Sequence, residues 1–170
     1  HILFCRLTAE QRKAYKHFIS SKTVRQVIAG RLNLLYAITM LRKICNHVDI
    51  ATASSQWDGP RWSSSKTLES TEALEPGIAE DVDEILEKDA EFGNWHRSGK
   101  MKVLDAVLSS WHRTGSRALL FSQTRTMLDI LESYAENRGF VFRRMDGQTA
   151  IASRMQLVDE FNEDRNIFLF

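Results

Sequence analysis

Two short polar segments of the chain combine the residue types that bind phosphate. Residues 121–125 read Phe-Ser-Gln-Thr-Arg, and residues 145–149 read Met-Asp-Gly-Gln-Thr. Each follows an apolar run typical of a strand and precedes a stretch with helical periodicity. In an open α/β sheet, loops of this kind lie side by side at the carboxyl ends of the strands. Hydroxyls, amides and backbone N–H groups at helix N-termini suit phosphate, so the two segments predict a phosphate-binding surface.

Simpler structural roles stay open for the same residues. Asp146 and Gly147 also form a common turn dipeptide at the end of a strand. Ser122 and Thr124 are residue types that favour helix caps, with or without a ligand. Three arginines near the two segments are equally compatible with solvated charges: Arg125, Arg143 and Arg144.

Several familiar catalytic patterns are missing from the sequence. It contains no G-x-x-x-x-G-K-[ST] loop, no G-x-G-x-x-G loop and no nucleophile elbow. We identify no Asp-Glu pair placed to hold Mg²⁺. Cys45, Asn46 and His47 supply too few ligands for zinc, which takes four. We therefore predict no metal site and no catalytic residue in this chain.

Residues 98–170 alternate between helical and extended patterns. Apolar residues at helical spacing predict three helices, over residues 101–111, 126–137 and 151–162. Short apolar runs predict three strands, over residues 117–121, 140–144 and 166–170. Strands that alternate with helices form parallel sheets through right-handed crossovers. The predicted fold class is therefore α/β, with a three-layer parallel sheet that is incomplete at three strands.

Residues 1–50 are interpreted as an α-helical protrusion that leads into the predicted α/β lobe of residues 98–170. Thr8 and Gln11 match a capping box at the start of a helix. The polar residues 20–23 predict an interruption. The clearest helix is expected over residues 31–47, with an apolar stripe that packs against a neighbour: Leu34, Ile38, Leu41 and Cys45, widened by Leu35 and Ile44.

Residues 51–97 differ in composition from the segments on either side. Ser, Thr, Gly and acids dominate, and both prolines lie here, so we interpret this segment as a flexible acidic insertion with a short helix over residues 81–91. Residues 67–91 hold ten acids and one Lys, whereas residues 1–50 hold nine Lys or Arg and two acids. The basic segment predicts contact with a polyanion, and the acidic run is either a solvated linker or a mask for the basic surface.

Composition bounds the class of protein. The 170 residues are 43% hydrophobic and 26% charged, which is ordinary for a globular domain. No stretch approaches the ~20 apolar residues needed to span a bilayer, so we expect no membrane contact. Cys5 and Cys45 are most simply reduced thiols, which fits the cytosol or nucleus. The sequence opens on His1 and stops at Phe170 inside an apolar run, so we expect a piece of a larger protein.

Further motifs flank the two polar segments in a fixed order. Ahead of the predicted lobe are residues 4–8 (FCRLT) and residues 41–47 (LRKICNH). Within the lobe the stretches are residues 98–101 (SGKM), 117–123 (RALLFSQ), 127–132 (MLDILE), 145–149 (MDGQT), Arg154 and 161–162 (FN). Together they resemble the second RecA-like lobe of SWI/SNF-type helicase-like ATPases, over residues 1–50 and 98–170.

Finer detail resembles one branch of this family, which acts on stalled RNA polymerase II in transcription-coupled DNA repair. The similar stretches are residues 4–8, 107–112 (VLSSWH) and 149–154 (TAIASR). One departure is Val48, where the family usually has proline. Without that proline we expect the preceding helix to run one or two residues further.

The resemblance implies that the chain is part of an ATP-dependent translocase on double-stranded DNA. In this family two RecA-like lobes grip one strand of the duplex by its phosphates, and ATP with Mg²⁺ binds between them. The resemblance implies phosphate contacts and two supporting cations in the polar segments, from Ser122, Gln123, Gly147, Gln148 and Thr149, and from Arg125 and Arg154. Gly147 would allow close backbone approach or a positive φ. Phosphate contacts do not read bases, so binding should tolerate sequence and respond to salt.

The family's Walker motifs belong to the first lobe, so the resemblance implies that this chain alone binds no ATP and does not hydrolyse it. It also implies a nuclear protein with RNA polymerase II as a partner, and nucleosomes as a further one. Two alternatives stay open: a non-enzymatic module that docks RNA polymerase II or histones, and a chromatin remodeller of another branch. An unrelated α/β phosphate-binding enzyme is disfavoured, because no cluster of acid, base and nucleophile is evident.

Overall fold

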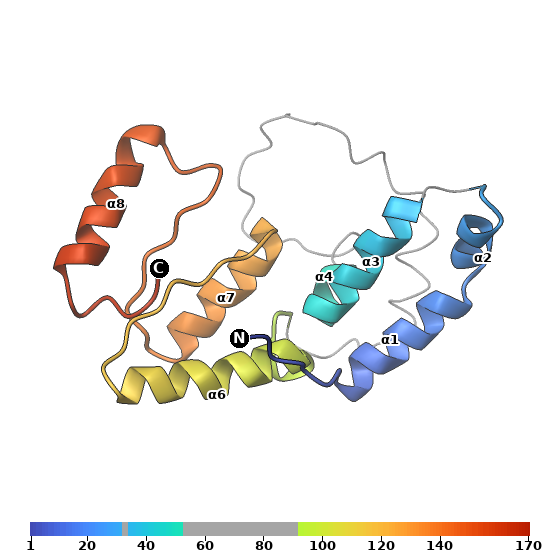
Figure 1. The fold of residues 1–170 in the computed structure, drawn as a ribbon, viewed down its shortest axis with the longest axis horizontal. Coiled ribbons are helices and arrows are strands. Elements are labelled where there is room, and N and C mark those ends of the chain that lie inside the picture. The colour runs from blue at the N-terminus through green and yellow to red at the C-terminus, as the bar shows by residue number, and fades with distance from the viewer. Residues whose placement is uncertain (32–33, 53–91) are drawn as a thin grey trace.

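The computed structural model describes residues 1–31, 34–52 and 92–170 (Figure 1). Most of the predicted insertion, including the helix expected over residues 81–91, lies outside the described residues. Four helices come first: α1 (Ala9–Ser20), α2 (Lys22–Ile28), α3 (Leu34–Asn46) and α4 (Val48–Thr52). A short 3₁₀ helix and three longer helices follow: η1 (Trp95–Arg97), α6 (Gly99–Arg113), α7 (Arg125–Asn137) and α8 (Ile151–Glu163). None of the described helices is long and apolar enough to cross a membrane.

The helices form two groups that α6 connects. Figure 1 shows α1 to α4 on one side, α7 and α8 on the other, and α6 along the lower edge with its N-terminus beside the first group. Together with α6, the second group corresponds to the predicted lobe. Its three helices begin and end within two residues of the predicted bounds, because caps and breaks frame strongly periodic stretches.

Local hydrogen bonds explain where α1 and α2 begin. Thr8 Oγ1 accepts the Gln11 N–H at 3.2 Å, and Gln11 Oε1 accepts the Thr8 N–H at 3.1 Å, which confirms the capping box. Ser21 then ends α1 in extended backbone, and its hydroxyl caps α2 by accepting the Val24 N–H. The predicted interruption at residues 20–23 is therefore confirmed.

The helix α3 buries a different stripe from the predicted one. Leu34 is 62% exposed, and Leu41 and Cys45 are only partly buried. The enclosed positions are Ala37, Met40 and Ile44, of which only Ile44 belonged to the predicted stripe. Apolar residues surround most of this helix, so spacing alone allowed two neighbouring stripes. The stripe with the small Ala37 and the adaptable Met40 lets α1 approach closely, and packing therefore selects it.

The helix α3 ends at Asn46 although no proline follows it, so the expected extension is wrong. The chain restarts as α4 at Val48. The intervening His47 is fully buried; its Nδ1 accepts the Asp49 N–H at 3.3 Å, and its Nε2 donates to the Asn94 carbonyl at 3.0 Å. The local bond from the Asp49 N–H and the long-range bond to Asn94 hold His47 where the helix breaks. Burial lowers the pKa of His47 below its ordinary value of 6.5, so the ring is neutral.

Three extended segments lie where strands were predicted. Leu169 forms isolated parallel bridges to Ala118 on one side and to Phe142 on the other. The Ala118 N–H donates to the Phe168 carbonyl at 2.9 Å, and the Phe168 N–H donates to the Val141 carbonyl at 2.8 Å. The last segment therefore lies between the first two, and all three run parallel. The described residues form bridges but no regular strand, so the predicted three-layer sheet stays a prediction.

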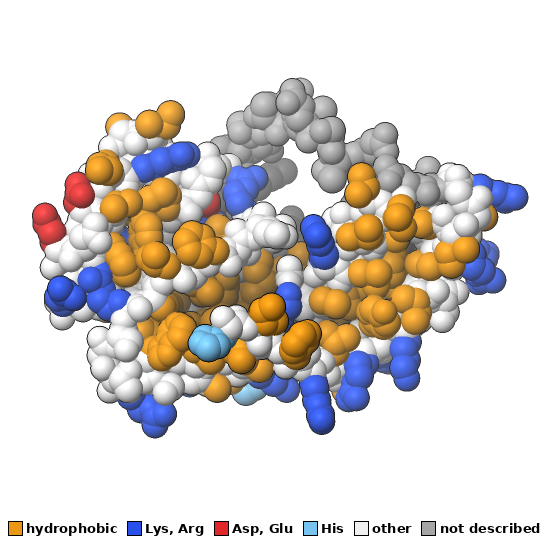
Figure 2. Space-filling model, in the orientation of Figure 1, with side chains coloured by type: hydrophobic (Ala, Val, Ile, Leu, Met, Phe, Trp, Pro, Cys, Tyr) orange, Lys and Arg blue, Asp and Glu red, His pale blue; other side chains and the backbone are white. Residues whose placement is uncertain are grey.

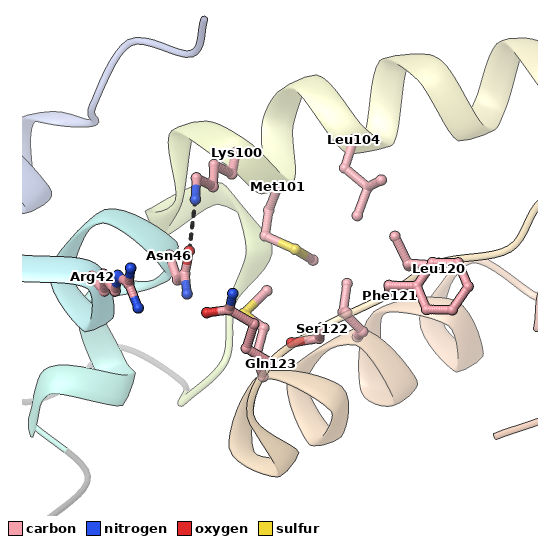
Figure 3. A pocket seen from close by; sticks show the side chains of 11 residues that line it. Arg42, Asn46, Lys100, Met101, Leu104, Leu120, Phe121, Ser122 and Gln123 are labelled. Atoms are coloured by element: carbon pink, nitrogen blue, oxygen red, sulfur yellow. Dashed lines mark hydrogen bonds between the residues drawn. The ribbon is translucent and has the colours of Figure 1, made fainter. Parts of the chain in front are cut away.

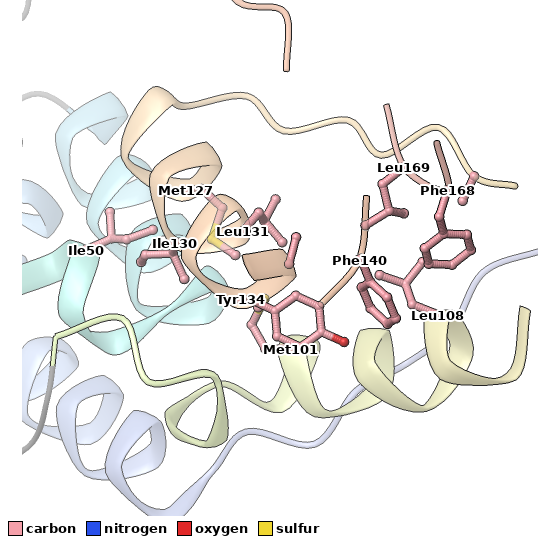
Figure 4. Packing of buried hydrophobic residues seen from close by; sticks show 12 residues of the cluster. Ile50, Met101, Leu108, Met127, Ile130, Leu131, Tyr134, Phe140, Phe168 and Leu169 are labelled. Carbon is pink, nitrogen blue, oxygen red and sulfur yellow. The ribbon is translucent and has the colours of Figure 1, made fainter. Parts of the chain in front are cut away.

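The core of the lobe lies between α6, α7 and the extended segments (Figure 4). Met101 and Leu108 of α6 are almost fully buried against Tyr134 of α7. The rings of Phe140 and Phe168 meet edge to face with centroids 4.9 Å apart. The Tyr134 hydroxyl donates to the Asp105 carboxylate at 2.7 Å, so this large buried side chain has a partner for its polar atom.

A buried amide joins the first group of helices to the lobe. Gln11 is fully buried in α1, and its Oε1 accepts the Gly99 N–H at 2.9 Å. Its Nε2 donates to the carbonyls of Ile44 at 2.8 Å and Cys45 at 3.3 Å. Gly99 also has no room for a side chain, since a Cβ there would lie 1.9 Å from the carbonyl oxygen of Arg6. One side chain therefore fixes the start of α6 against the end of α3.

Arg97 adds a charged link at the same junction. Its Nε lies 2.6 Å from Glu10 Oε2, and its Nη1 lies 2.6 Å from Asp49 Oδ1. These are the two acids of residues 1–50, so both are held by a residue of the second part of the chain. Figure 2 shows the consequence: Lys and Arg side chains line the edge of the molecule over α1 and α2.

Replacing Gln11 by Ala should cost about 3 kcal/mol of stability, because it leaves the Gly99 N–H and the Ile44 carbonyl buried without partners. The measurement is urea unfolding of the protein followed by circular dichroism. Arg12→Ala, at the exposed neighbour on the same helix, is the control and should change stability by less than about 0.5 kcal/mol. Equal effects of the two substitutions would contradict the role of Gln11.

His47 should make stability depend on pH. Its pKa is lowered in the folded protein, so the unfolded chain takes up a proton first as the pH falls. The free energy of unfolding that the neutral His47 contributes is fully present above pH 6.5, the ordinary pKa of histidine. It is lost as the pH falls from there toward the lowered pKa of His47 in the folded protein. Urea unfolding should be measured at about pH 7.5 and about pH 5.5. The free energy of unfolding should fall less between these two pH values in His47→Gln than in the unmodified protein. The same loss in both proteins would show that another group is responsible.

Candidate nucleic-acid interface

The first polar segment, residues 121–125, turns from an extended segment into α7. Thr124 Oγ1 accepts the Met127 N–H at 3.4 Å, which confirms its interpretation as a helix cap. Ser122 Oγ donates to the Thr124 carbonyl at 3.4 Å. Gln123 is exposed, and its side chain points toward α3 (Figure 3). The segment therefore presents one amide and one hydroxyl on the same side.

A groove of about 450 Å³ lies beside this segment, between α3, α6 and α7. Its apolar lining comes from Met101, Leu104, Leu120, Phe121, Met127 and Leu131. Its polar lining comes from Arg42, Asn46, Lys100, Ser122 and Gln123. Lys100 Nζ donates to Asn46 Oδ1 at 2.7 Å (Figure 3). Two cations and three neutral polar groups thus converge on one space, which suits an anionic oxygen group.

Three of these residues were not among the residues assigned to phosphate contact from the sequence, which left Lys100 open between contact with DNA and contact with the acidic insertion. Arg42 and Asn46 belong to the motif over residues 41–47, and Lys100 belongs to the motif over residues 98–101. The motifs were visible in the sequence, but 54 positions separate Asn46 from Lys100. Their convergence with Gln123 depends on the junction at Gln11, which no local pattern indicates.

The second polar segment folds on itself. The Asp146 N–H donates to Thr149 Oγ1 at 3.0 Å, and the Thr149 N–H donates to the Asp146 carbonyl at 3.1 Å. Asp146 Oδ1 also accepts the Gln148 N–H at 2.8 Å. These bonds form a closed turn with Gly147 and Gln148 exposed at its tip. The simpler interpretation as a turn therefore describes the local structure correctly.

Gly147 does not have a positive φ, so that part of the expectation is wrong. A Cβ built at Gly147 would meet nothing within 4 Å. The turn closes through the Asp146 side chain instead of through a left-handed residue. Packing among the described residues therefore does not require a glycine here, and close approach of a ligand to this backbone stays a prediction.

The start of α8 faces this turn. Arg154 reaches back from the first turn of the helix, and its Nε donates to the Thr149 carbonyl at 3.0 Å. Ala150, at the N-cap position, makes no side-chain cap hydrogen bond. The first backbone N–H groups of α8 therefore lack a side-chain acceptor at their cap, and the positive end of the helix dipole lies next to the turn.

Two of the three arginines interpreted as solvated charges are held in ion pairs, so that interpretation is wrong for them. Arg143 Nε lies 2.7 Å from Glu160 Oε2 of α8. Arg144 bridges three carboxylates: Asp129, Glu132 and Asp146. Arg125, at the start of α7, is exposed.

The charge on Asp146 links the two segments. The Gln148 N–H and the Arg144 guanidinium lower the pKa of Asp146, and Arg125 of the first segment contributes in the same direction. Asp146 is therefore ionised at neutral pH, and Arg125 lies within electrostatic reach of it.

The predicted site residues occupy two neighbouring places instead of one pocket. Figure 1 shows both segments at the same end of the lobe, where α7 and α8 begin. The groove includes Ser122 and Gln123, whereas the exposed turn carries Gly147, Gln148 and Thr149. Among the described residues, no group of three or more His, Cys, Asp or Glu could hold a metal ion.

Comparison with known proteins places the chain in a family. Residues 99–170 match the helicase conserved C-terminal domain. The DNA excision repair protein ERCC-6 of Homo sapiens is 43% identical over 169 residues, which are 99% of this chain and 10% of that protein. Protein CHROMATIN REMODELING 8 of Arabidopsis thaliana is 41% identical over 170 residues, which are 100% of this chain and 12% of that protein.

A yeast protein and a solved structure extend the comparison. The DNA repair and recombination protein RAD26 of Saccharomyces cerevisiae is 36% identical over 174 residues, or 99% of this chain and 13% of that protein. The chain thus spans about a tenth of the length of its curated relatives. The crystal structure of the C-terminal part of the Fun30 ATPase domain superposes with a TM-score of 0.59 at 23% identity, over 100% of this chain and 67% of that one, and shares the fold. Residues 99–170 are therefore a helicase C-terminal domain, and the chain belongs to the SWI/SNF-type helicase-like ATPases of the group that includes ERCC-6 and RAD26.

Proposed function

We propose that this chain supplies part of the DNA grip of a nuclear, ATP-dependent translocase on double-stranded DNA, which acts in transcription-coupled repair and chromatin remodelling. The observation that carries the proposal is the groove in which Arg42 and Lys100 meet Ser122 and Gln123. Residues 122 and 123, which line it, lie at the end of the lobe that also carries the turn at residues 146–149 (Figure 1). Both places offer groups that suit phosphate oxygens and offer no arrangement that reads bases.

In the groove, charge and hydrogen bonding would act together on the phosphate backbone. Arg42 and Lys100 would each replace a condensed counterion, which makes binding depend on salt. Gln123 offers amide N–H groups and is exposed, so it is free to turn toward a phosphate oxygen. The Ser122 hydroxyl is close enough to act as a second donor once it leaves its long 3.4 Å bond to Thr124.

The turn would contact the next part of the same backbone. Thr149 Oγ1 accepts the Asp146 N–H, so the hydrogen of its hydroxyl remains able to donate to a phosphate oxygen. Gln148 and the Gly147 backbone are exposed at the tip. The uncapped start of α8 adds backbone donors and a positive dipole, with Arg154 close by as a supporting cation.

ATP and Mg²⁺ would act outside this chain. Among the described residues, no group of three or more His, Cys, Asp or Glu could hold a metal ion, and the carboxylates near the turn are paired with Arg144. In the proposed division, residues 1–50 form the helical protrusion, residues 51–97 the insertion and residues 98–170 the first half of the second lobe. The role of the chain is to hold duplex DNA while the lobes open and close, and RNA polymerase II and nucleosomes are its proposed larger partners.

One observation favours a second function beside DNA binding. Leu34 and Leu35 of α3 are 62% and 67% exposed, although they lie on a folded helix next to the groove. Exposed apolar side chains that lie close together mark protein contact sites. The protrusion would then dock a protein such as RNA polymerase II or a histone while the lobe holds DNA.

The single variants Gln123→Ala and Thr149→Ala should each weaken the activation of the full-length ATPase by DNA. Each change removes a hydrogen bond to a charged phosphate, so the DNA concentration for half-maximal activation should rise by about tenfold. The measurement is phosphate release as a function of duplex concentration. Gln156→Ala and Thr114→Ala, at exposed positions of α8 and the end of α6, are matched controls that should leave it unchanged. Activation that is unaffected in Gln123→Ala and Thr149→Ala would show that these segments do not touch DNA.

The two cations of the groove should set part of the salt dependence. The slope of log affinity against log salt is negative, and the double variant Arg42→Gln with Lys100→Gln should make it shallower by about 2, because two counterions are no longer released. Fluorescence anisotropy with duplexes of unrelated sequence measures this slope. Lys102→Gln with Arg113→Gln, at exposed positions of α6, is the matched control. Equal slopes in the two double variants would exclude the groove as a phosphate site.

A further inference from the structure

We propose that Arg144 is a positioning residue that locks the turn at residues 146–149 to α7 and so fixes the second DNA-contacting segment relative to the first. The sequence left open whether this arginine is a solvated charge, and it lies outside the predicted contact set. The inference rests on the proposed function above, because the turn matters only if it contacts phosphate.

The two ends of the guanidinium bind different elements. On the α7 side, Arg144 Nη1 lies 2.7 Å from Asp129 Oδ1 and 2.6 Å from Glu132 Oε2. On the turn side, Nη2 lies 2.9 Å and Nε 3.2 Å from Asp146 Oδ2. A planar fork with several fixed donors can span two elements in this way, whereas a single ammonium group cannot.

The chain of bonds continues from Asp146 to the tip of the turn. Asp146 uses Oδ2 for Arg144, which leaves Oδ1 to accept the Gln148 N–H at 2.8 Å. The backbone N–H of Asp146 holds Thr149 Oγ1 at 3.0 Å. The positions of the proposed contact residues Gln148 and Thr149 therefore depend on the orientation of one carboxylate, and Arg144 sets that orientation.

The same helix also carries the first segment. Thr124 caps α7 through the Met127 N–H, and residues 121–123 precede this cap. The opposite face of α7 is anchored by Ile130 and Tyr134, which are 2% exposed in the core. A helix packed in this way moves little on its own. Through Arg144, α7 thus fixes both segments to one rigid element.

Arg144 also neutralises charge next to the proposed phosphate path. Without it, three carboxylates would lie beside the turn, and they would repel the DNA backbone. Partial burial opposes ionisation, but the hydrogen bonds that the guanidinium donates to Asp129, Glu132 and Asp146 raise the pKa of Arg144. Its charge is therefore present at any working pH.

Arg143, the preceding residue, provides a matched control. It is 35% exposed and pairs with Glu160 of α8 at 2.7 Å, so it has one carboxylate partner and no bond to the turn. Arg143→Gln removes the same charge and the same kind of ion pair at the adjacent position. A difference between the two variants reports on the turn and not on net charge or general stability.

The test compares Arg144→Gln and Arg143→Gln in the full-length protein with two readouts. The first is hydrogen exchange of the peptide spanning residues 145–151 without DNA, which Arg144→Gln should accelerate by about tenfold because it frees the turn. The second is DNA-stimulated phosphate release. Its half-maximal DNA concentration should rise severalfold in Arg144→Gln, with an unchanged rate at saturating DNA. Arg143→Gln should match the unmodified protein in both.

Two gentler variants keep the test decisive if Arg144→Gln folds poorly. Arg144→Lys retains the charge but cannot span both elements, so it should still show fast exchange of the turn. Glu132→Gln loosens the α7 side without touching the turn, and it should show a smaller increase in the same direction. If Arg144→Lys equals the unmodified protein in both readouts, charge alone is responsible and the positioning role is overturned.

The remaining outcomes separate this inference from the proposed function. Unchanged exchange in Arg144→Gln overturns the positioning role. Fast exchange with normal DNA activation also overturns it, and Thr149→Ala measured in parallel then identifies the cause. If Thr149→Ala impairs DNA activation, only the role of Arg144 fails; if it does not, the turn makes no DNA contact and the proposed function fails there.

Discussion

The rest of this structure depends on the hydrogen bonds of one buried amide. Gln11 caps its own helix, accepts the first N–H of α6 and donates to the last carbonyls of α3. These bonds bring together three segments that are far apart in the sequence. The groove at Gln123 exists because the ends of α3 and α6 are held side by side, which places Arg42 next to Lys100. A structural hydrogen-bond network therefore creates the candidate phosphate site.

Paired charges then decide which surfaces stay positive. Arg97 binds both acids of residues 1–50, so the protrusion presents its cations with little compensation. Arg144 has the opposite effect near the turn, where it offsets part of a cluster of carboxylates. Both arginines are partly or largely shielded from solvent, and each connects elements instead of contacting a ligand. The proposed DNA surface thus also depends on two arginines whose charges are paired within the structure.

Sequence patterns located most helices, because caps and periodicity are local properties. The capping box of Thr8 and the break at residues 20–23 are confirmed, and the three lobe helices agree closely with prediction. The buried face of α3 was wrong, since its apolar residues cover more than one stripe and only a packing partner selects between them. The end of α3 was also wrong, because the buried imidazole of His47 bonds to residue 94, which the local sequence does not indicate.

The sequence by itself determined the family, the order of the elements and the two polar segments, because these are written in consecutive residues. The cap at Thr124 and the turn at Asp146 and Gly147 were local interpretations that the sequence already offered, and the structure confirms them. Only the tertiary structure decided that Arg144 is held between α7 and the turn by three carboxylates. It also added Arg42 and Lys100 to the site. The physical reason is that hydrogen bonds and ion pairs form between atoms that are close in space, and sequence spacing encodes such closeness only within a helix or a turn.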